Sequence, residues 1–447
     1  MDLYEKLSQI EKYFEENYPR LGVNKRREGV RLAFEIVKRE RLGNLSFLEG
    51  EYKNYESFKK RLLKRRYPVS SGKTGLGNFY LPRLDLKKEY AFRPAQGGPQ
   101  PEKIYFEKSA RGSKLFSRLK KLFPGAFFSE IGKLKDFEGE FDLSRYNARN
   151  STLFLVREKF DFLKPCPCTR GCVSCGYFVF NPGFGCPFEC SYCFLQGYQN
   201  VPGLVLPVNI EDFFAEFDRR FSGLKKKIRI GSGEFTDSLA LDPLTGFSSE
   251  IAEFFSKKEN VYFEFKTKSG NISNLLGIKA SPNIVVSFSM TPPALASENE
   301  FLSAGFESRL EALSRLEKYG YSAAFHLDPV IFTSGWEKLY KDMLGRIFEA
   351  VPPERIKWVS LGTFRFRPET KKAIENRFPD NKILDEEMLL DFDGKLRYPF
   401  AVRLEIYSTL VKQLASAGMD VRKLYLCMES REMWDKLGLS AGFAWDL

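Results

Sequence analysis

The sequence predicts an α/β fold in which parallel strands alternate with helices. Short runs rich in β-branched and aromatic residues recur in its second half, and segments with helical periodicity lie between them. The β-rich runs are 227–232, 261–267, 283–290, 321–330 and 356–364, and the helical segments are 210–221, 248–256, 306–318 and 337–350. This alternation leaves an open doubly wound sheet and a closed or partial barrel as alternatives. In both, chemistry is expected where the strand C-termini enter their loops.

The charge of the chain is unevenly distributed. Its 447 residues carry a net charge of +12, and residues 1–150 alone hold 33 Lys and Arg against 20 Asp and Glu. The basic runs 25–27 and 59–66 are interleaved with Tyr55, Phe58 and Tyr67, a pattern typical of contact with a phosphate backbone. A solvated helix face accounts for any single run, but the asymmetry of the whole segment favours nucleic acid, most plausibly DNA, as a partner.

Changes in composition divide the chain into four predicted parts. Residues 1–100 form a basic extension, helical to about residue 66 and then rich in Gly, Ser and Pro. Residues 101–175 lead to a four-cysteine group, 176–400 hold the strand and helix alternation, and 401–447 form a C-terminal segment. The charged start and the lack of a long apolar run predict a cytoplasmic protein that does not bind membranes.

Seven of the eight cysteines fall between Cys166 and Cys193, too close together to staple separate parts of a fold. Such clustered thiols are typical of metal ligands. The last three, Cys186, Cys190 and Cys193, are spaced C-x3-C-x2-C. Three thiolates on a [4Fe-4S] cluster leave one iron open, and S-adenosylmethionine can chelate that iron. An electron from the cluster then breaks the S–C bond and yields a 5′-deoxyadenosyl radical. A zinc site is the alternative for these three ligands.

The first four cysteines suffice for a second site. Cys166, Cys168, Cys172 and Cys175 can hold an auxiliary [4Fe-4S] cluster or a structural zinc, and both remain open. Outside this region, His326 is the one histidine of the sequence, and it stands two residues from Asp328 on a predicted strand. The two side chains can contact substrate, or each can satisfy the hydrogen-bonding capacity of the other.

The residues around and after the cysteines resemble the spore photoproduct lyase-like family of radical S-adenosylmethionine enzymes. The resemblance runs from about residue 103 to the C-terminus. Its clearest pieces are GCPFECSYCFLQGY, GEFTDSLALDPLT, FKTKS, SFSM, the GW at 335–336 and DGKLRY. It implies a partial (β/α)6 barrel of the TIM type, with the cluster in the loop after a first strand at 177–181. Residues 1–100 lie outside it.

The resemblance also implies roles for individual residues. Tyr192, just before the last cluster cysteine, matches an aromatic residue beside the adenine and one of a catalytic tyrosine pair. Ser232, Glu234, Lys268 and Ser289 match positions that contact S-adenosylmethionine. Flavodoxin or ferredoxin is the implied electron donor.

The family's founding activity is the repair of a methylene-bridged thymine dimer in spore DNA, in which a cysteine returns a hydrogen atom to the product radical. Here Glu234 takes the place of that cysteine and Phe194 that of the second tyrosine. Cys427 is a candidate substitute donor, although it can equally be a small buried hydrophobic residue. Two alternatives stay open: radical modification of a peptide or small molecule, and a zinc-containing nucleic-acid-binding protein without catalysis.

Overall fold

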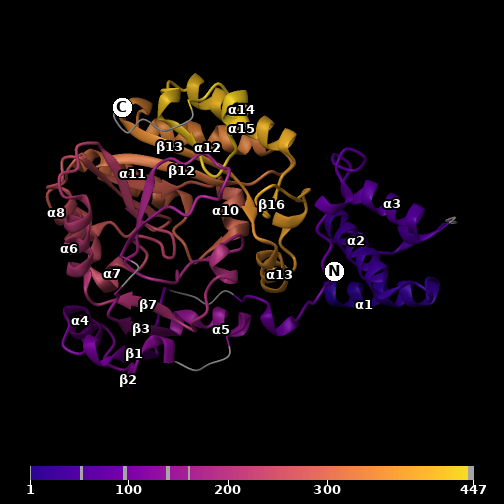
Figure 1. The fold of residues 1–447 in the computed structure, drawn as a ribbon, viewed down its shortest axis with the longest axis horizontal. Coiled ribbons are helices and arrows are strands. Elements are labelled where there is room, and N and C mark those ends of the chain that lie inside the picture. The colour runs from indigo at the N-terminus through magenta and orange to yellow at the C-terminus, as the bar shows by residue number, and fades with distance from the viewer. Residues whose placement is uncertain (1, 51–53, 94–97, 137–140, 160–161, 441–447) are drawn as a thin grey trace. The chain divides into compact units, whose positions relative to one another are not determined.

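The computed structural model describes residues 2–50, 54–93, 98–136, 141–159 and 162–440 (Figure 1). The chain forms two compact units, one of residues 1–93 with 364–403 and one of residues 94–363 with 404–447. No helix in the described ranges is long and apolar enough to span a bilayer. The four-part division predicted from the sequence stays a prediction.

Three helices form the N-terminal part of the first unit. They are α1 (Leu3–Asn17), α2 (Val23–Glu40) and α3 (Tyr55–Arg66). Asp2 caps α1 by accepting a hydrogen bond from the backbone N–H of Tyr4 at 2.9 Å. The α1 and α2 helices cross closely at Gly29, where a Cβ atom would lie 2.3 Å from the Phe14 ring. Phe14 also packs against Phe58 of α3, with 5.8 Å between ring centroids.

The same unit includes a later segment of the chain. This segment contributes helix α13 (Pro368–Arg377) and a small antiparallel sheet in the order β14 (Arg365–Phe366), β16 (Leu396–Arg397), β15 (Leu389–Leu390).

Buried charges join that segment to the N-terminal helices. Glu35 of α2 accepts hydrogen bonds from Arg66 at 2.8 Å and from Lys371 of α13 at 2.7 Å. Arg31 lies one turn earlier and pairs with Glu375 at 2.5 Å. Burial opposes the charge on Glu35, but the three cations around it hold its pKa well below the usual range. The unit is therefore held together by a buried charge network as well as by its apolar core.

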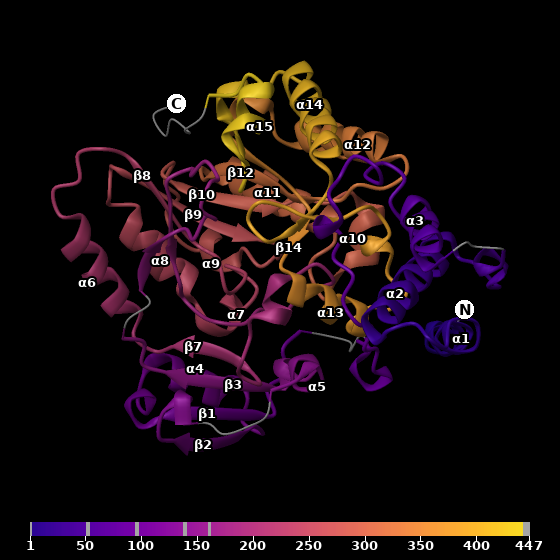
Figure 2. The same cartoon turned by 45° about the vertical axis from the view of Figure 1, so that its right-hand side comes forward.

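The second unit contains a small parallel sheet. Its strands, in sheet order, are β2 (Phe127–Ile131), β1 (Lys103–Glu107), β3 (Thr152–Val156) and β7 (Leu204–Pro207). Figure 2 shows these strands side by side with helix α4 (Lys114–Leu122), and α5 (Leu143–Asn147) follows β2 along the chain.

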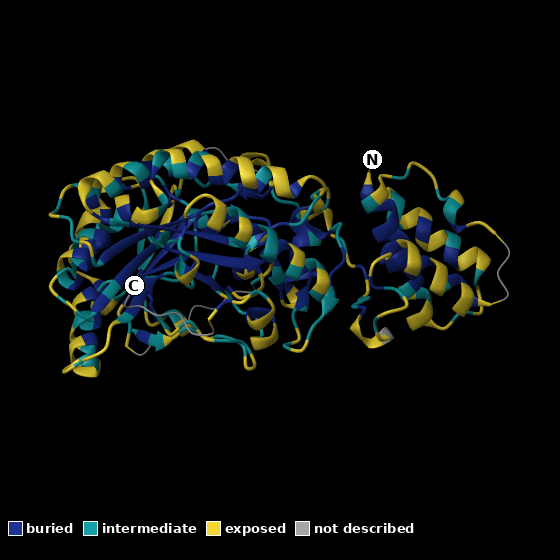
Figure 3. Cartoon of the chain, turned by 90° about the horizontal axis from the view of Figure 1, so that it is seen from above, coloured by how far each residue is buried: buried dark blue, intermediate teal, exposed yellow. Residues whose placement is uncertain are grey.

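An eight-stranded sheet forms the core of the second unit. Its order is β17 (Leu424–Leu426), β13 (Ile356–Thr363), β12 (Ser322–Val330), β10 (Ile284–Ser289), β9 (Val261–Thr267), β8 (Ile228–Ser232), β5 (Tyr177–Phe180) and β4 (Leu163–Pro165). The pairs from β5 to β17 are parallel, and β4 runs antiparallel to β5. Figure 3 shows the strands buried among helices whose outer faces are exposed. The predicted alternation of strands and helices is confirmed.

Helices connect successive strands of this sheet. They are α6 (Ile210–Phe221), α7 (Asp242–Thr245), α8 (Phe247–Phe255), α9 (Ser273–Leu276), α10 (Pro293–Asn299), α11 (Phe306–Tyr319), α12 (Trp336–Ala350), α14 (Phe400–Ser416) and, after the last strand, α15 (Arg431–Lys436). A two-stranded antiparallel pair, β6 (Glu189–Cys190) with β11 (Glu300–Phe301), lies outside the main sheet.

The main sheet curls into a partial barrel. Arg229 of β8 donates a hydrogen bond to the Tyr425 hydroxyl of β17 at 2.8 Å. Five strand spacings separate these strands in the sheet order, which in a flat sheet would be about 24 Å. The sheet must therefore bend until its ends face each other, which is the predicted (β/α)6-type partial barrel.

The four-cysteine segment bridges the two edges of this barrel. It leaves β4 at one edge and returns through β5. Between them Val173 donates a backbone hydrogen bond of 2.9 Å to Glu429, and Cys172 forms an antiparallel bridge with Ser430. Glu429 and Ser430 follow β17 at the other edge. The segment thus closes the seam that an eight-stranded open sheet would leave.

Candidate metal centre and cofactor site

The three cysteines of the C-x3-C-x2-C motif follow strand β5, as predicted. Cys190 is buried in β6, Cys186 and Cys193 are half-buried, and the Cys193 N–H donates to the Cys190 carbonyl at 3.0 Å. Burial raises the pKa of Cys186 strongly, and the nearby Asp237, Cys193 and Cys190 raise it further. A bound cation stabilises neighbouring thiolates that raise one another's pKa in this way, and it replaces their protons.

A buried arginine holds the backbone of this cysteine loop. Arg149 is fully buried, and its guanidinium donates to the carbonyls of Cys186 at 3.0 Å and Phe188 at 2.8 Å. It also pairs with Glu189 at 2.5 Å, and the neighbouring Asn150 donates to the Pro187 carbonyl at 2.8 Å. These contacts fix four consecutive residues of the loop. The hydrogen-bond donors of Arg149 and Asn150 therefore hold the backbone of the cysteine loop in place from one side.

A second buried network fixes the other side of the loop. Glu300 of β11 pairs with Cys190 in the backbone register, and its carboxylate accepts hydrogen bonds from the Tyr192 hydroxyl and, at 2.7 Å, from Thr291. Arg309 of α11 pairs with the same carboxylate at 2.5 Å. Burial and the Glu300 charge raise the pKa of Tyr192 well above its usual range. The Tyr192 phenol is therefore neutral and held in one orientation.

The predicted cofactor contacts lie at the C-terminal ends of adjacent strands. Ser232 ends β8, Ser289 ends β10, and Lys268 follows β9 directly. The Ser232 hydroxyl is buried without a hydrogen-bond partner among the described residues. The Lys268 ammonium lies 5.4 Å from the centre of the Tyr192 ring. Burial opposes its charge, but Cys190 and Glu300 raise its pKa above the usual value.

The fourth predicted contact, Glu234, lies two residues beyond β8. Its carboxylate pairs with Lys164 of β4 at 3.2 Å. The structure therefore brings Ser232, Lys268 and Ser289 to neighbouring strand ends of the sheet, while Glu234 faces the β4 edge. A buried hydroxyl without a partner and a lysine held cationic suit the carboxylate and hydroxyl groups of S-adenosylmethionine.

Asp237 organises the loop after β8 and was not predicted as a site residue. Its carboxylate accepts hydrogen bonds from the Thr267 hydroxyl and the Lys268 backbone N–H, both at 2.7 Å. It also accepts from the N–H groups of Leu239 and Ala240. It thereby ties the loop after β8 to the end of β9. Its signal in the sequence was its place within GEFTDSLALDPLT, where an Asp begins a turn.

A charged network fills the barrel interior. Glu264 of β9 pairs with Arg229 at 2.5 Å and accepts hydrogen bonds from Trp358 and His326, each at 2.9 Å. Gly231 of β8 lies beside this network, and a Cβ atom at Gly231 would lie 2.1 Å from the Tyr177 hydroxyl. His326 therefore forms a hydrogen bond with Glu264. The two roles predicted for His326 were contact with substrate and a mutual contact with Asp328, and neither includes Glu264 as a partner.

The four-cysteine segment and Cys427 lie at the barrel seam. The Cys166 and Cys168 sulfurs are 3.9 Å apart, and the Cys166 N–H donates to the Tyr177 carbonyl at 2.8 Å. Cys427 follows β17, and its N–H donates to the Leu361 carbonyl at 2.7 Å. None of the eight cysteines forms a disulfide. Within the described ranges, no three Cys, His, Asp or Glu side chains already have the geometry of a bound metal ion, including the Cys186 set.

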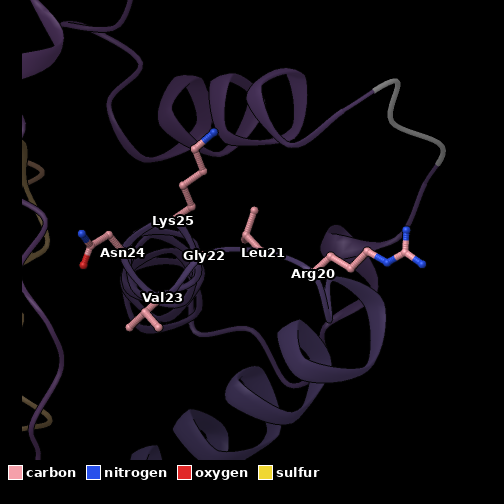
Figure 4. A pocket seen from close by; sticks show the side chains of 6 residues that line it. All are labelled: Arg20, Leu21, Gly22, Val23, Asn24 and Lys25. Atoms are coloured by element: carbon pink, nitrogen blue, oxygen red, sulfur yellow. The ribbon is translucent and has the colours of Figure 1, made fainter.

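A shallow hollow of about 440 Å³ lies in the first unit, at the connection from α1 to α2. Arg20, Leu21, Gly22, Val23, Asn24 and Lys25 line it. Figure 4 shows the side chains of Arg20 and Lys25 pointing in different directions rather than toward a common point. No predicted site residue lines it.

We expect Arg149→Met to impair the metal centre. The change leaves Glu189 buried without its cation and frees two loop carbonyls, which should cost about 3–5 kcal/mol of stability. Iron per chain after anaerobic reconstitution and the urea midpoint measure the effect. Arg111→Met serves as the control, because Arg111 is exposed and its pair with Glu130 lies at the surface. Normal iron loading in Arg149→Met would contradict this role.

We expect His326 to stay neutral through mildly acidic pH. Burial and then the Lys266 charge lower its pKa to about 4, despite Glu264 beside it. Because the unfolded state takes up the proton first, near pH 6.5, stability should fall as the pH drops from about 6.5 toward 4. The single histidine gives one imidazole signal in ¹³C-histidine NMR. A midpoint near 6.5 in the folded protein would refute the assignment, and His326→Gln should remove this part of the pH dependence.

Comparison with known proteins identifies the family of the chain. The family model described as "Spore photoproduct lyase" matches residues 100–397. The spore photoproduct lyase of Clostridium acetobutylicum is 24% identical over 264 residues, which cover 58% of this chain and 76% of that protein. The lyase of a Geobacillus species is 28% identical over 302 residues, covering 64% and 85%.

Solved structures of spore photoproduct lyase show the same fold. One variant matches with a TM-score of 0.63 at 21% identity, covering 73% of this chain and 98% of that one. Another, with bound AdoMet and dinucleoside spore photoproduct, matches with a TM-score of 0.62 and the same coverage. The family match spans more than half of this chain, from β1 to β16. The chain belongs to the spore photoproduct lyase family and is a radical S-adenosylmethionine enzyme.

Proposed function

We propose that this enzyme starts radical chemistry on DNA lesions of the thymine-dimer kind. The observation that carries the proposal is a pair of exposed aromatic rings directly after the last cluster cysteine. Phe194 is 42% exposed and Tyr198 is 48% exposed, with 5.9 Å between their ring centroids. Large exposed rings beside a catalytic centre are typical platforms for unstacked bases. The dinucleoside spore photoproduct that is bound in a solved relative presents two such bases.

Further groups extend this aromatic platform, which consists of Phe194, Tyr198 and Phe235. The Tyr198 ring lies 6.3 Å from that of Phe235, and the Lys164 ammonium sits 4.5 Å from the Phe235 ring centre. Lys164 can bind a phosphate oxygen while the rings hold the bases. The platform thus combines stacking and charge at one place.

The residues at the strand ends fit the proposed cofactors. When bound to Cys186, Cys190 and Cys193, a [4Fe-4S] cluster with S-adenosylmethionine supplies the 5′-deoxyadenosyl radical. Lys268 offers a cation to the cofactor carboxylate, Ser232 and Ser289 offer hydroxyls, and the Tyr192 ring lines the same space. Glu234 remains a proposed partner of the cofactor ammonium.

The step that returns a hydrogen atom must differ from that of relatives with a cysteine at this place. Glu234 is engaged with Lys164, and a carboxylate does not donate a hydrogen atom. Cys427 stays a proposed donor. The Glu234–Lys164 pair also favours a second candidate, a radical modification of a different substrate, such as a peptide or small molecule that carries charge.

Other sequence predictions remain part of the proposal. Flavodoxin or ferredoxin would supply the electron, the protein would work in the cytoplasm, and the division at residues 100, 175 and 400 would separate functional parts. Cys166, Cys168, Cys172 and Cys175 would hold a second metal, as a [4Fe-4S] cluster or zinc. Membership of an enzyme family favours catalysis over the alternative of a zinc-containing binding protein.

Anaerobic turnover of dinucleoside spore photoproduct with dithionite tests the proposal. We expect 5′-deoxyadenosine together with loss of the lesion, and neither product with Cys186, Cys190 and Cys193 all changed to Ala. Phe194→Ala and Tyr198→Ala should each weaken lesion binding by about 5- to 150-fold, the equivalent of 1–3 kcal/mol of stacking. Phe127→Ala is the control, because Phe127 is also exposed but lies on β2. Release of 5′-deoxyadenosine with the lesion untouched would favour the second candidate.

The basic extension is expected to contact the DNA backbone. Lys60 and Lys64 are exposed one turn apart on α3, and no described residue forms an ion pair with them. Reversing both to Glu should reduce the slope of log affinity against log salt by about 2, since each phosphate contact contributes about 0.9. The control is Lys12→Glu, because Lys12 already pairs with Glu16 on α1. An unchanged slope would remove this surface from the DNA interface.

A further inference from the structure

One buried arginine connects the separate elements that carry the proposed cofactor contacts. Arg309 lies near the start of helix α11, and its side chain is almost fully buried. A guanidinium has five N–H donors in a fixed planar arrangement, so it can hold several acceptors at set angles at once. The acceptors of Arg309 come from the end of strand β10 and from residues 300–304, which precede the helix.

The first contacts of Arg309 reach the ends of two strands of the main sheet. Its Nη1 donates a hydrogen bond of 2.8 Å to the carbonyl of Ser289, the last residue of β10. Its Nε donates to the Ala304 carbonyl at 2.8 Å, and the Ala304 N–H donates to the Lys268 carbonyl at 3.0 Å. Arg309 thereby fixes the backbone at Ser289 directly and the backbone at Lys268 through one intervening residue.

The next contact of Arg309 reaches the cysteine loop through Glu300. The Arg309 Nη2 pairs with one oxygen of the Glu300 carboxylate at 2.5 Å, and the other oxygen accepts a hydrogen bond from the Tyr192 hydroxyl. Burial opposes the charge on Glu300, but Arg309 and Lys268 hold the pKa of Glu300 below its usual value. An ionised carboxylate can only accept hydrogen bonds, so Tyr192 donates to it and its ring is held in place.

The three residues joined in this way serve different parts of the proposed cofactor. Lys268 is the proposed partner of the cofactor carboxylate, Ser289 offers a hydroxyl, and the Tyr192 ring is expected beside the adenine. These residues follow β9, end β10 and follow β6, so no single element fixes their spacing. The carboxylate and the adenine lie at opposite ends of S-adenosylmethionine. A shift of about 1 Å caused by a change far from the reacting atoms can cost about 100-fold in rate.

We propose that Arg309 is a positioning residue that sets the spacing between the residues that bind the two ends of S-adenosylmethionine. It acts through Glu300 and through backbone carbonyls. This role rests on the proposed cofactor contacts and adds the residue that aligns them. Lysine at this position would keep a positive charge beside Glu300, but its ammonium is a point charge on a flexible stem and lacks the planar fork. Arg309→Lys therefore separates alignment from charge.

The test is anaerobic calorimetric titration of the reconstituted full chain with S-adenosylmethionine. We expect Arg309→Lys to weaken the affinity by about 10- to 100-fold, as is typical when a residue that orients a ligating group is lost, and to keep the iron content per chain. A purely structural role would lower the iron content together with the affinity. Arg315→Lys is the control, because Arg315 lies exposed on the same helix and pairs with Glu311 at 3.7 Å. Unchanged affinity in Arg309→Lys would overturn the proposal.

Two further variants make each outcome decisive. Lys268→Met should weaken the affinity by at least about 10-fold, because it removes the charged partner of the cofactor carboxylate. Unchanged affinity in Lys268→Met would overturn the proposed cofactor contact and the role of Arg309 with it, whereas weaker binding in Lys268→Met alone would overturn only the role of Arg309. If Arg309→Lys loses iron, the pair Arg309→Met with Glu300→Gln removes both charges and replaces it in the titration. Loss of iron in that variant as well would overturn the proposal. No lesion is present, so failure of DNA repair would leave these results unaffected.

Discussion

The partial barrel depends on one buried cation. Arg229 reaches from β8 to the tyrosine of β17 and pairs with Glu264, while its flat faces lie against the rings of Tyr177 and Trp358. An arginine in the interior is costly unless its donors and its charge are matched. Here the matching groups come from strands at both ends of the sheet. The same contacts that satisfy the charge therefore set the curvature, and the curvature positions the strand ends that carry the site.

The cysteine loop illustrates how a local motif depends on distant parts of the chain. Arg149 binds the loop from a segment 37 residues upstream, and Glu300 binds it from 110 residues downstream of Cys190. Neither residue is adjacent to the motif in sequence. Both belong to buried ion pairs, and removal of either partner would leave an unmatched charge. The thiols themselves need little rigidity of their own, because the surrounding network supplies it.

Much of the fold could be predicted because its signals are local. β-rich runs such as 261–267 and 283–290 alternate with segments of helical periodicity. The observed strands β9 and β10 differ from these two runs by a residue or less at each end. The C-x3-C-x2-C spacing and the residues at strand ends likewise depend on positions close in sequence. Arg149, Glu300 and the Arg229–Glu264 pair could not be found in this way. Their partners are brought together by tertiary folding, and one sequence holds no record of that pairing.

The joining of residues 1–93 with 364–403 was also beyond sequence reasoning, which placed the boundary of the basic extension at residue 100. Glu35 sits between Arg66 and Lys371, and Arg31 meets Glu375, so the two segments share one set of charges. This has a practical consequence for anyone preparing a shortened enzyme. A version trimmed to the region that its relatives share would expose α13 with its ionic partners missing. Such trimming should favour insoluble protein, and the extension is better treated as part of the folding unit than as a detachable tail.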